Sequence, residues 1–303
     1  MNLPRGMQVL ERGWLSANNV LLFSKGATVV DSGYGAHAAQ TVALIEHALQ
    51  ERPLEHLVNT HCHSDHMGGN AALQRRFRCR TSIPEGEAPL IDRWDERELI
   101  LSAADQRAER FGYESTFRGG DTLRMGDYDW RVLPAPGHDL HAVMFYSPET
   151  RVLISGDALW ENGFGAVFAQ LFGRDTALAE TRETLERIAG LDCDIVIPGH
   201  GRPFGDAAGA LERAFSRLKG YEKDTGRLAR HVVKVLFTFA MLEKRSMPLA
   251  EVPAYLGRIA ILAEINRTHL KMTPAAIAEW LVADLERAGA LERRGGQLRA
   301  KGP

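Results

Sequence analysis

The segment "NTHCHSDHMGG" (residues 59–69) places three histidines and one aspartate between His61 and His66. The chain of 303 residues contains only 11 histidines, so this crowding needs a cause. Imidazole nitrogens and carboxylate oxygens are the ligands that zinc and similar transition metals take from proteins. The segment therefore predicts a metal site, and it requires a fold that brings further ligands to the same loop.

The spacing within "HCHSDH" indicates two neighbouring ions rather than one. Side chains at alternate positions project to one side, so His61 and His63 point one way while Asp65 and His66 turn the other way. One loop can then serve two metals, provided that other loops complete both ligand sets. Three later glycine-flanked segments offer suitable residues: "PGHD" with His138, "SGD" with Asp157 and "PGHG" with His200.

Taken together and in this order, these motifs resemble the metallo-β-lactamase superfamily of hydrolases over roughly residues 8–205. The resemblance implies an α/β fold, the four-layer αββα sandwich. It also implies two divalent metal ions, zinc in first place, with iron or manganese as alternatives. The ligand sets that it implies are His61, His63 and His138 for one ion, Asp65, His66 and His200 for the second, and Asp157 as the bridge between them.

The resemblance further implies hydrolysis by a hydroxide shared between the two ions, which Asp65 orients or deprotonates as the catalytic residue. The segment "GDALW" (residues 156–160) is similar to the glyoxalase II and thioesterase-like branch. An activated acyl bond of a small metabolite, a thioester, ester or lactone, is therefore the expected substrate. Trp160, Phe164 and Phe168 are candidate walls of its pocket, with packing in the hydrophobic core as an equal alternative.

Hydrophobic periodicity predicts where the ligand loops lie. "LEHLVNTH" is typical of a strand that runs into the histidine cluster, and "CDIVIPGH" of a strand that ends at His200. "DTLRMGDYDWRVLPAPGH" and "AVMFYSPETRVLISGD" predict successive strands that end near His138 and Asp157. Helices are predicted over "AHAAQTVALIEHALQ" and "DTALAETRETLERIAGL".

The sequence predicts two domains. Residues 1–205 form the catalytic domain, with one or two inserted helices over about 86–117 that cap the site. Residues 206–303 form a helical domain that is winged-helix-like over 246–303. Thr273 and Pro274 are typical of a helix start there, and "LERRGGQLRA" is typical of a hairpin around a Gly-Gly turn.

The two predicted domains have net charges of opposite sign. Residues 206–303 carry 17 Lys plus Arg against 11 Asp plus Glu, a net charge of +6, whereas residues 1–205 carry a net charge of −8. A basic tail keeps a second function open, namely a nuclease or phosphodiesterase that acts on RNA. However, Arg202 is the only basic residue beside a ligand loop, so nucleic acid is the less favoured partner. A β-lactamase and an iron sulfur dioxygenase rank behind both hypotheses.

Nothing in the sequence predicts an exported or membrane protein. The N-terminus lacks the basic and apolar regions of a signal peptide, and the longest apolar run, residues 232–242, contains Lys234. Three scattered cysteines do not suit a disulfide framework. We therefore expect a cytoplasmic enzyme that binds a small acyl substrate and no membrane, and a homodimer is compatible with this composition.

Overall fold

The computed structural model describes residues 2–301, in which two β-sheets pack face to face. The first sheet has the strand order β1-β2-β3-β4-β5-β6. Its first three strands pair antiparallel, and β3 to β6 pair in parallel. The strands are β1 (Met7–Leu10), β2 (Asn19–Phe23), β3 (Ala27–Val30), β4 (Leu54–Val58), β5 (Arg80–Pro84) and β6 (Ser115–Phe117).

The second sheet has the order β11-β10-β9-β8-β7 and is antiparallel except for the parallel pair β10 and β11. Because β10 and β11 run in the same direction, the residues that follow them emerge at one edge of the sheet. Its strands are β7 (Thr122–Met125), β8 (Tyr128–Pro134), β9 (Val143–Ser147), β10 (Val152–Gly156) and β11 (Ile195–Pro198).

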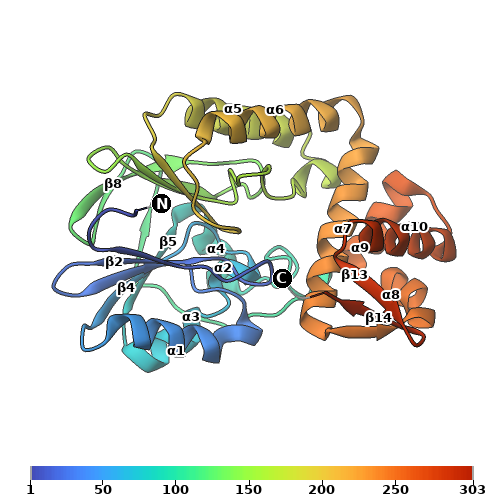
Figure 1. Ribbon diagram of the computed structural model, residues 1–303, viewed down its shortest axis with the longest axis horizontal. Helices are drawn as coiled ribbons and strands as arrows, with labels where there is room; N and C mark the ends of the chain where they lie inside the picture. Colours follow the sequence, from blue (N-terminus) through green and yellow to red (C-terminus); the bar gives the residue numbers. More distant parts are fainter. Residues whose placement is uncertain (1, 302–303) are drawn as a thin grey trace.

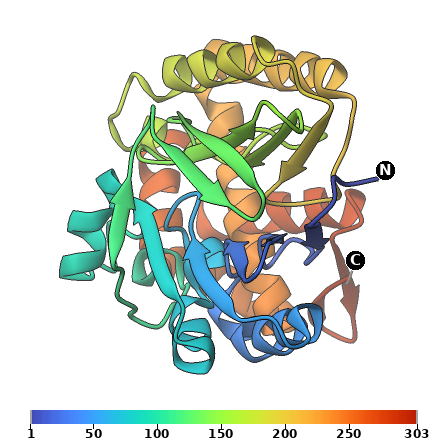
Figure 2. The same cartoon turned by 90° about the vertical axis from the view of Figure 1, so that its left-hand side faces the viewer.

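Helices cover the outer face of each sheet, which gives the predicted four-layer αββα sandwich (Figures 1 and 2). Helices α1 (Ala38–Leu49) and α3 (Asn70–Phe77) lie outside the first sheet, and α5 (Ala177–Ala189) and α6 (Ala207–Lys223) lie outside the second. Successive side chains of β2 point to opposite faces of the sheet, which explains the layering. Leu21 packs toward α1, while Val20 and Leu22 pack between the sheets. The expected α/β class is confirmed.

The segment expected to contain inserted helices is mostly irregular. It contains one short α-helix, α4 (Ala88–Arg93), and a 3₁₀ turn at Ser102–Ala104, and its last residues form β6 instead. Its apolar side chains, among them Leu99, Leu101 and Phe111, are buried in a cluster under the loop, so their spacing reflects loop packing and not a helix. Ile100, with φ of 56°, interrupts any regular helix there. Of the one or two inserted helices that the sequence predicts, the structure therefore contains only the short α4 and single 3₁₀ turns.

The C-terminal part is helical, as predicted, and ends in a small sheet. Helix α7 (Thr225–Lys244) runs along the edge of the sandwich (Figure 1). The remaining α-helices and strands are α8 (Val252–Arg258), α9 (Ala260–Ile265), α10 (Pro274–Arg287), β12 (Ser246–Pro248), β13 (Leu291–Arg294) and β14 (Gln297–Ala300). Within residues 2–301, no helix combines the length and the apolar character that crossing a membrane requires.

The predicted signals at the two ends of α10 are confirmed. The Thr273 hydroxyl accepts a hydrogen bond from the backbone N–H of Ala276 at 3.2 Å, and Pro274 is the first helical residue. Gly295 and Gly296 have φ of 58° and 75°, which a tight hairpin turn requires, and they connect β13 to β14. Residues 1, 302 and 303, at the ends of the two predicted domains, lie outside the described residues.

The C-terminal helices share a hydrophobic core with the second sheet. One continuous cluster contains Leu153 and Val196 of the sheet, Leu218 of α6 and Val233 of α7. Polar contacts add to this packing, because Glu243 at the end of α7 accepts a hydrogen bond from the Tyr34 hydroxyl at 2.8 Å. Helix α7 is therefore fixed against the catalytic domain on two sides.

His56 on β4 makes stability depend on pH. Burial, followed by the nearby Arg80, lowers the pKa of His56 to about 4. In the unfolded chain His56 binds a proton near pH 6.5. The contribution of neutral His56 to the free energy of unfolding is therefore fully present above about pH 6.5 and is lost as the pH falls toward 4. We expect wild-type protein to lose about 1–2 kcal/mol more than His56→Gln between pH 7.5 and pH 5, measured by urea unfolding. Equal losses in the two proteins would contradict this assignment.

Candidate metal centre

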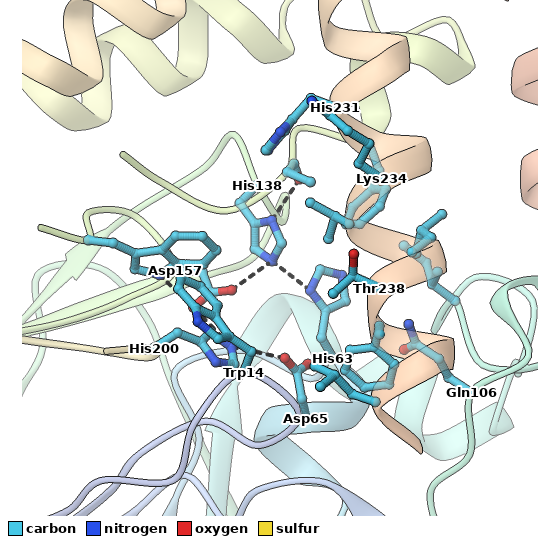
Figure 3. A pocket seen from close by; sticks show the side chains of 18 of the residues that line it. Trp14, His63, Asp65, Gln106, His138, Asp157, His200, His231, Lys234 and Thr238 are labelled. Carbon is cyan, nitrogen blue, oxygen red and sulfur yellow. Dashed lines mark hydrogen bonds and ion pairs between the residues drawn. The ribbon is translucent and has the colours of Figure 1, made fainter. Parts of the chain in front are cut away.

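Four loops bring the seven predicted ligands together at one edge of the sandwich. The loop after β4 supplies four of them, and helix α2 (Ser64–Met67) begins within it. The loops after β8, β10 and β11 supply one residue each. Figure 3 shows side chains from all four loops converging on one pocket. Residues from distant parts of the sequence thus meet as predicted: His61, His63, Asp65, His66, His138, Asp157 and His200.

His61, His63 and His138 form the first group. They offer one nitrogen each, and these atoms lie within 4.8 Å of one another. His63 Nδ1 and His138 Nε2 are 2.9 Å apart, and His138 Nδ1 donates to the carbonyl oxygen of Ala166 at 2.7 Å if that nitrogen carries the proton. The backbone contact then leaves Nε2 of His138 unprotonated and directed at the centre.

Asp65, His66 and His200 form the second group, and their ligand atoms also lie within 4.8 Å of one another. His200 Nε2 lies 3.0 Å from Asp65 Oδ2. Asp65 and His66 occupy the first turn of α2, which explains why they diverge from the side of the loop that carries His61 and His63.

Asp157 lies between the two groups. Its Oδ2 is 3.4 Å from His138 Nε2, and its Oδ1 is 3.4 Å from His66 Nε2 and 3.9 Å from His200 Nε2. Although burial alone would raise it, His66 and His200 hold the pKa of Asp157 well below its usual range. The carboxylate is therefore ionised and faces both groups with one oxygen each.

Two buried histidine nitrogens indicate that this centre is suited to bind a metal. Within the part of the chain that the structure describes, His61 Nε2 and His66 Nε2 are buried and lack a hydrogen-bond partner. Burial, and next the neighbouring His66, lowers the pKa of His61 well below its usual range, so its ring is neutral. A buried nitrogen with a free lone pair, such as Nε2 of the neutral His61, is costly unless it binds a donor or a cation. The donor set, imidazoles with two carboxylates, fits transition metals such as zinc.

Asp31 contacts the metal-ligand loop through both oxygens of its carboxylate. Its Oδ2 lies 2.8 Å from His66 Nδ1 and accepts a hydrogen bond from the Thr60 hydroxyl, and its Oδ1 accepts from the Thr60 backbone N–H. Asp31 has a left-handed φ of 58°, which costs a non-glycine residue on the order of 1 kcal/mol. Thr60 Oγ1 also lies 3.0 Å from His61 Nδ1. One carboxylate thus orients two ligand rings.

Replacing Asp31 by asparagine is expected to weaken metal binding by about 10–100-fold, because the His66 ring loses the acceptor that orients it. Competition with a chelator of known affinity measures this change, and Asp129→Asn on the exposed end of β8 serves as a control. Unchanged affinity in Asp31→Asn would show that His66 is oriented by its packing alone.

Glycines provide the space that the side chains need. A Cβ atom at position 199 would lie 2.3 Å from Asp157 Oδ1, and a Cβ atom at position 165 would lie 2.5 Å from His138 Nδ1. The glycine in "PGH" before His200 is therefore explained by the close approach of the Asp157 carboxylate.

Two tryptophans border the centre on its solvent side. Trp14, 55% exposed, stacks on the His200 ring with centroids 5.6 Å apart, and Trp160 donates through Nε1 to Asp157 Oδ1 at 3.1 Å. Trp160 and Phe168 line the pocket as expected. Phe164 instead takes the alternative, packing in the core, because this ring is buried against Tyr221 of α6.

The opposite wall comes from helix α7, which no motif in the sequence connects to the centre. The cavity has a volume of about 290 Å³, and Val235, Thr238, Phe239 and Leu242 of α7 line it together with the centre (Figure 3). Gln106 of the irregular segment lines it too, and its side chain accepts from the Ser64 hydroxyl. Sequence reasoning missed these residues, since only tertiary packing brings them to the pocket.

His141 and Arg202 do not belong to the centre. The backbone N–H of His141 donates to Asp139, and its ring packs against Gly86. Arg202 is exposed and does not line the cavity. Sequence reasoning missed Asp139, whose Oδ2 lies 3.8 Å from His63 Nε2.

Comparison with known proteins supports the geometry. A hydroxyacylglutathione hydrolase of Brucella ovis is 28% identical over 209 residues, which cover 67% of this chain and 72% of that protein. The same protein of Brucella abortus (strain 2308) matches equally.

Two solved structures share the fold over almost the whole chain. A metallo-β-lactamase family protein from Thermus thermophilus has a TM-score of 0.60 at 22% identity, with 98% of this chain and 99% of that one covered. A β-lactamase domain protein from Burkholderia ambifaria has a TM-score of 0.60 at 23% identity, covering 99% and 93%. Residues 12–200 match the sequence profile of the Metallo-beta-lactamase superfamily. The chain therefore belongs to the metallo-β-lactamase superfamily of metal-dependent hydrolases.

Proposed function

We propose that this protein is a binuclear zinc hydrolase that cleaves an activated acyl bond, a thioester in first place. The observation that carries this proposal is the position of the two ligand groups, which share Asp157, at one wall of a cavity whose opposite wall is apolar. The names of the Brucella relatives support a thioester, and "GDALW" (residues 156–160) is consistent with them.

We assign His61, His63 and His138 to one ion, Asp65, His66 and His200 to the other, and Asp157 to both. When bound, the two ions lower the pKa of a water molecule and stabilise the negative charge that develops on the carbonyl oxygen. Asp65 orients the attacking water and accepts its proton. In the net reaction a C–O bond forms, the C–S bond breaks, and the thiol leaves with a proton.

The remaining residues position the metal ligands and the substrate. Asp31 and Thr60 hold the rings of His66 and His61, so the ligands need little reorganisation. Trp14 and Trp160 border the side on which the leaving group departs, and the apolar residues of α7 exclude water from the acyl chain.

A phosphodiester substrate has less support in the cavity. Besides the histidines, Lys234 is the basic residue that lines it within the described range, and its Nζ forms an ion pair with Asp284 at 2.9 Å. A phosphodiester substrate needs free cations near the reacting phosphate.

Hydrolysis of S-lactoylglutathione, octanoyl-thiophenol and single-stranded RNA by the zinc-loaded protein tests this proposal. We expect turnover of at least one thioester and none of RNA. Asp65→Asn is expected to lower kcat by about 10²–10⁴-fold, in the range typical of a lost general base. Turnover of RNA alone would replace the acyl hydrolase by a nuclease.

A further inference from the structure

A second, basic pocket adjoins the metal cavity on the far side of His231 and Lys234. It has a volume of about 620 Å³ and lies between α6, α7 and the loop that contains Asn162. His231 and Lys234 line both cavities, so these two side chains form the boundary between the two spaces. The other lining residues are Asn162, Glu212, Arg213, Ser216, Arg217, Tyr221 and Arg227.

Two arginines of this pocket have charges that the protein does not neutralise. Among residues 2–301, no carboxylate lies within 4.0 Å of the guanidinium nitrogens of Arg217 or Arg227. The other two cations are engaged, since Lys234 pairs with Asp284 and Arg213 donates to the carbonyl oxygen of Glu161 at 2.9 Å. Glu212 is the carboxylate that lines the pocket, and the two arginines outnumber it, so the pocket has a net positive charge.

Both arginine side chains lie against glycine backbone. A Cβ atom at position 163 would lie 2.3 Å from Arg217 Nη1, and one at position 220 would lie 3.0 Å from Arg227 Nη1. Gly163 has φ of 129°, a conformation that other residues rarely adopt. The absence of a side chain at these positions leaves room for the guanidinium groups beside the pocket. Planar guanidinium groups bind carboxylate and phosphate through paired hydrogen bonds.

The distance between the two pockets and the surface that separates them suit an acyl chain. Figure 3 shows Thr238, Lys234 and His231 following one another along α7, away from Asp65. Thr238 and His231 are seven positions apart, which corresponds to about 10 Å along a helix. Phe168 and Val235 give the intervening wall an apolar surface. A ligand that fills both spaces needs an apolar segment of that length and an anionic end.

We propose that the substrate is a thioester whose acyl chain ends in an oxyanion, a carboxylate or a phosphate, which Arg217 and Arg227 bind in the second pocket. This inference rests on the proposed acyl hydrolysis and adds the class of acyl group. The acyl chain lies along α7, because Val235, Leu236 and Phe239 give that wall an apolar surface. The leaving group lies toward Trp14, which is exposed to solvent.

Matched substrates test the proposal in the zinc-loaded enzyme. They are 4-nitrothiophenol thioesters of one octanoyl chain that ends in a methyl, a carboxylate or a phosphonate group. We expect kcat/KM for the better anionic substrate to exceed that for the methyl substrate by about 10–100-fold, the range of a charged hydrogen-bonded contact. The preferred anionic substrate distinguishes a carboxylate from a phosphate.

The double variant Arg217→Gln/Arg227→Gln is expected to reduce this ratio to about one while it leaves the methyl substrate unaffected. Arg217→Lys/Arg227→Lys keeps the charge and is expected to restore part of the preference. Arg230→Gln removes a charge from an exposed position of α7 outside both cavities and is expected to keep the wild-type ratio. A wild-type ratio near one, or a ratio that the glutamine variant retains, would overturn the proposal. Stimulation of the methyl substrate by inorganic phosphate would also overturn it, because the pocket would then bind a separate effector.

Binding of the free octanedioate dianion separates this proposal from the proposed function. If the enzyme hydrolyses no thioester, the acyl hydrolase is wrong, and calorimetry with octanedioate and inorganic phosphate then tests the pocket alone. Binding of either anion to the wild type that is lost in Arg217→Gln/Arg227→Gln supports the anion site. Equal binding to both proteins, or binding to neither, overturns it.

Discussion

Replacing Asp157 by alanine is expected to lower kcat by roughly 10³-fold or more and to reduce the content of both metals, because its two oxygens face both ligand groups. Removing this carboxylate also leaves the rings of His66 and His138 without their common anionic neighbour. Metal analysis after dialysis, together with the rate of thioester hydrolysis, measures both effects.

His200→Ala is the informative comparison, since His200 belongs to the second group alone and its loss is expected to empty mainly that site. His141→Ala is the control, because His141 lies near the centre in sequence but outside its ligand groups. Retention of two metals and near-normal kcat in Asp157→Ala would rule out the shared role assigned to this residue.

Deleting residues 207–301 together with the end of the chain is expected to yield aggregated protein. The deleted helices contribute to the same core as the second sheet, and their loss exposes apolar surface that α6 covers. The fully or almost fully buried side chains removed with α6 and α7 include Ala210, Ala214, Leu218, Leu228, Val232, Val233, Leu236 and Phe237. At about 1.5–3 kcal/mol for each of the six large side chains, the lost burial is about 9–18 kcal/mol, which is comparable with the whole stability of a typical domain.

A single substitution within the intact chain gives the matched comparison. Phe237 is fully buried in α7, and Phe237→Ala is expected to cost about 3–5 kcal/mol while the protein still folds and binds metal. Solubility, sedimentation and urea unfolding distinguish the two cases. A truncated protein that stays soluble, keeps its kinetics on small thioesters and loses only RNA binding would identify the tail as a nucleic-acid module.

The sequence predicts the candidate centre well because the chemistry of the centre is local. His61, His63, Asp65 and His66 share one loop, and each of the other three ligands follows a strand with a recognisable apolar pattern. Glycine beside each of those three residues reflects the same crowding, which position 199 illustrates through its approach to Asp157. Local spacing and strand periodicity are both properties that a sequence displays directly.

The rest of the pocket could not be predicted, because it depends on packing between distant segments. Leu99 and Leu101 have a spacing that also suits a helix, but they are buried beneath an irregular loop with left-handed residues. Phe164 and Phe168 differ by one helical turn in sequence, yet one fills the core and the other lines the pocket. Arg217 on α6 reaches the second pocket only because α6 and α7 pack against each other, which no local pattern shows.

Metal content measured together with hydrolysis tests the central claim most directly. Purified protein is loaded with zinc, its metal content is determined, and the same sample is assayed on thioesters, lactones, phosphodiesters, RNA and a chromogenic β-lactam. The proposed function predicts two zinc ions per chain, with thioester turnover that a chelator abolishes and added zinc restores. A content that stays at one ion with Asp65 and His66 unligated, or thioester turnover that survives complete metal removal, would contradict it.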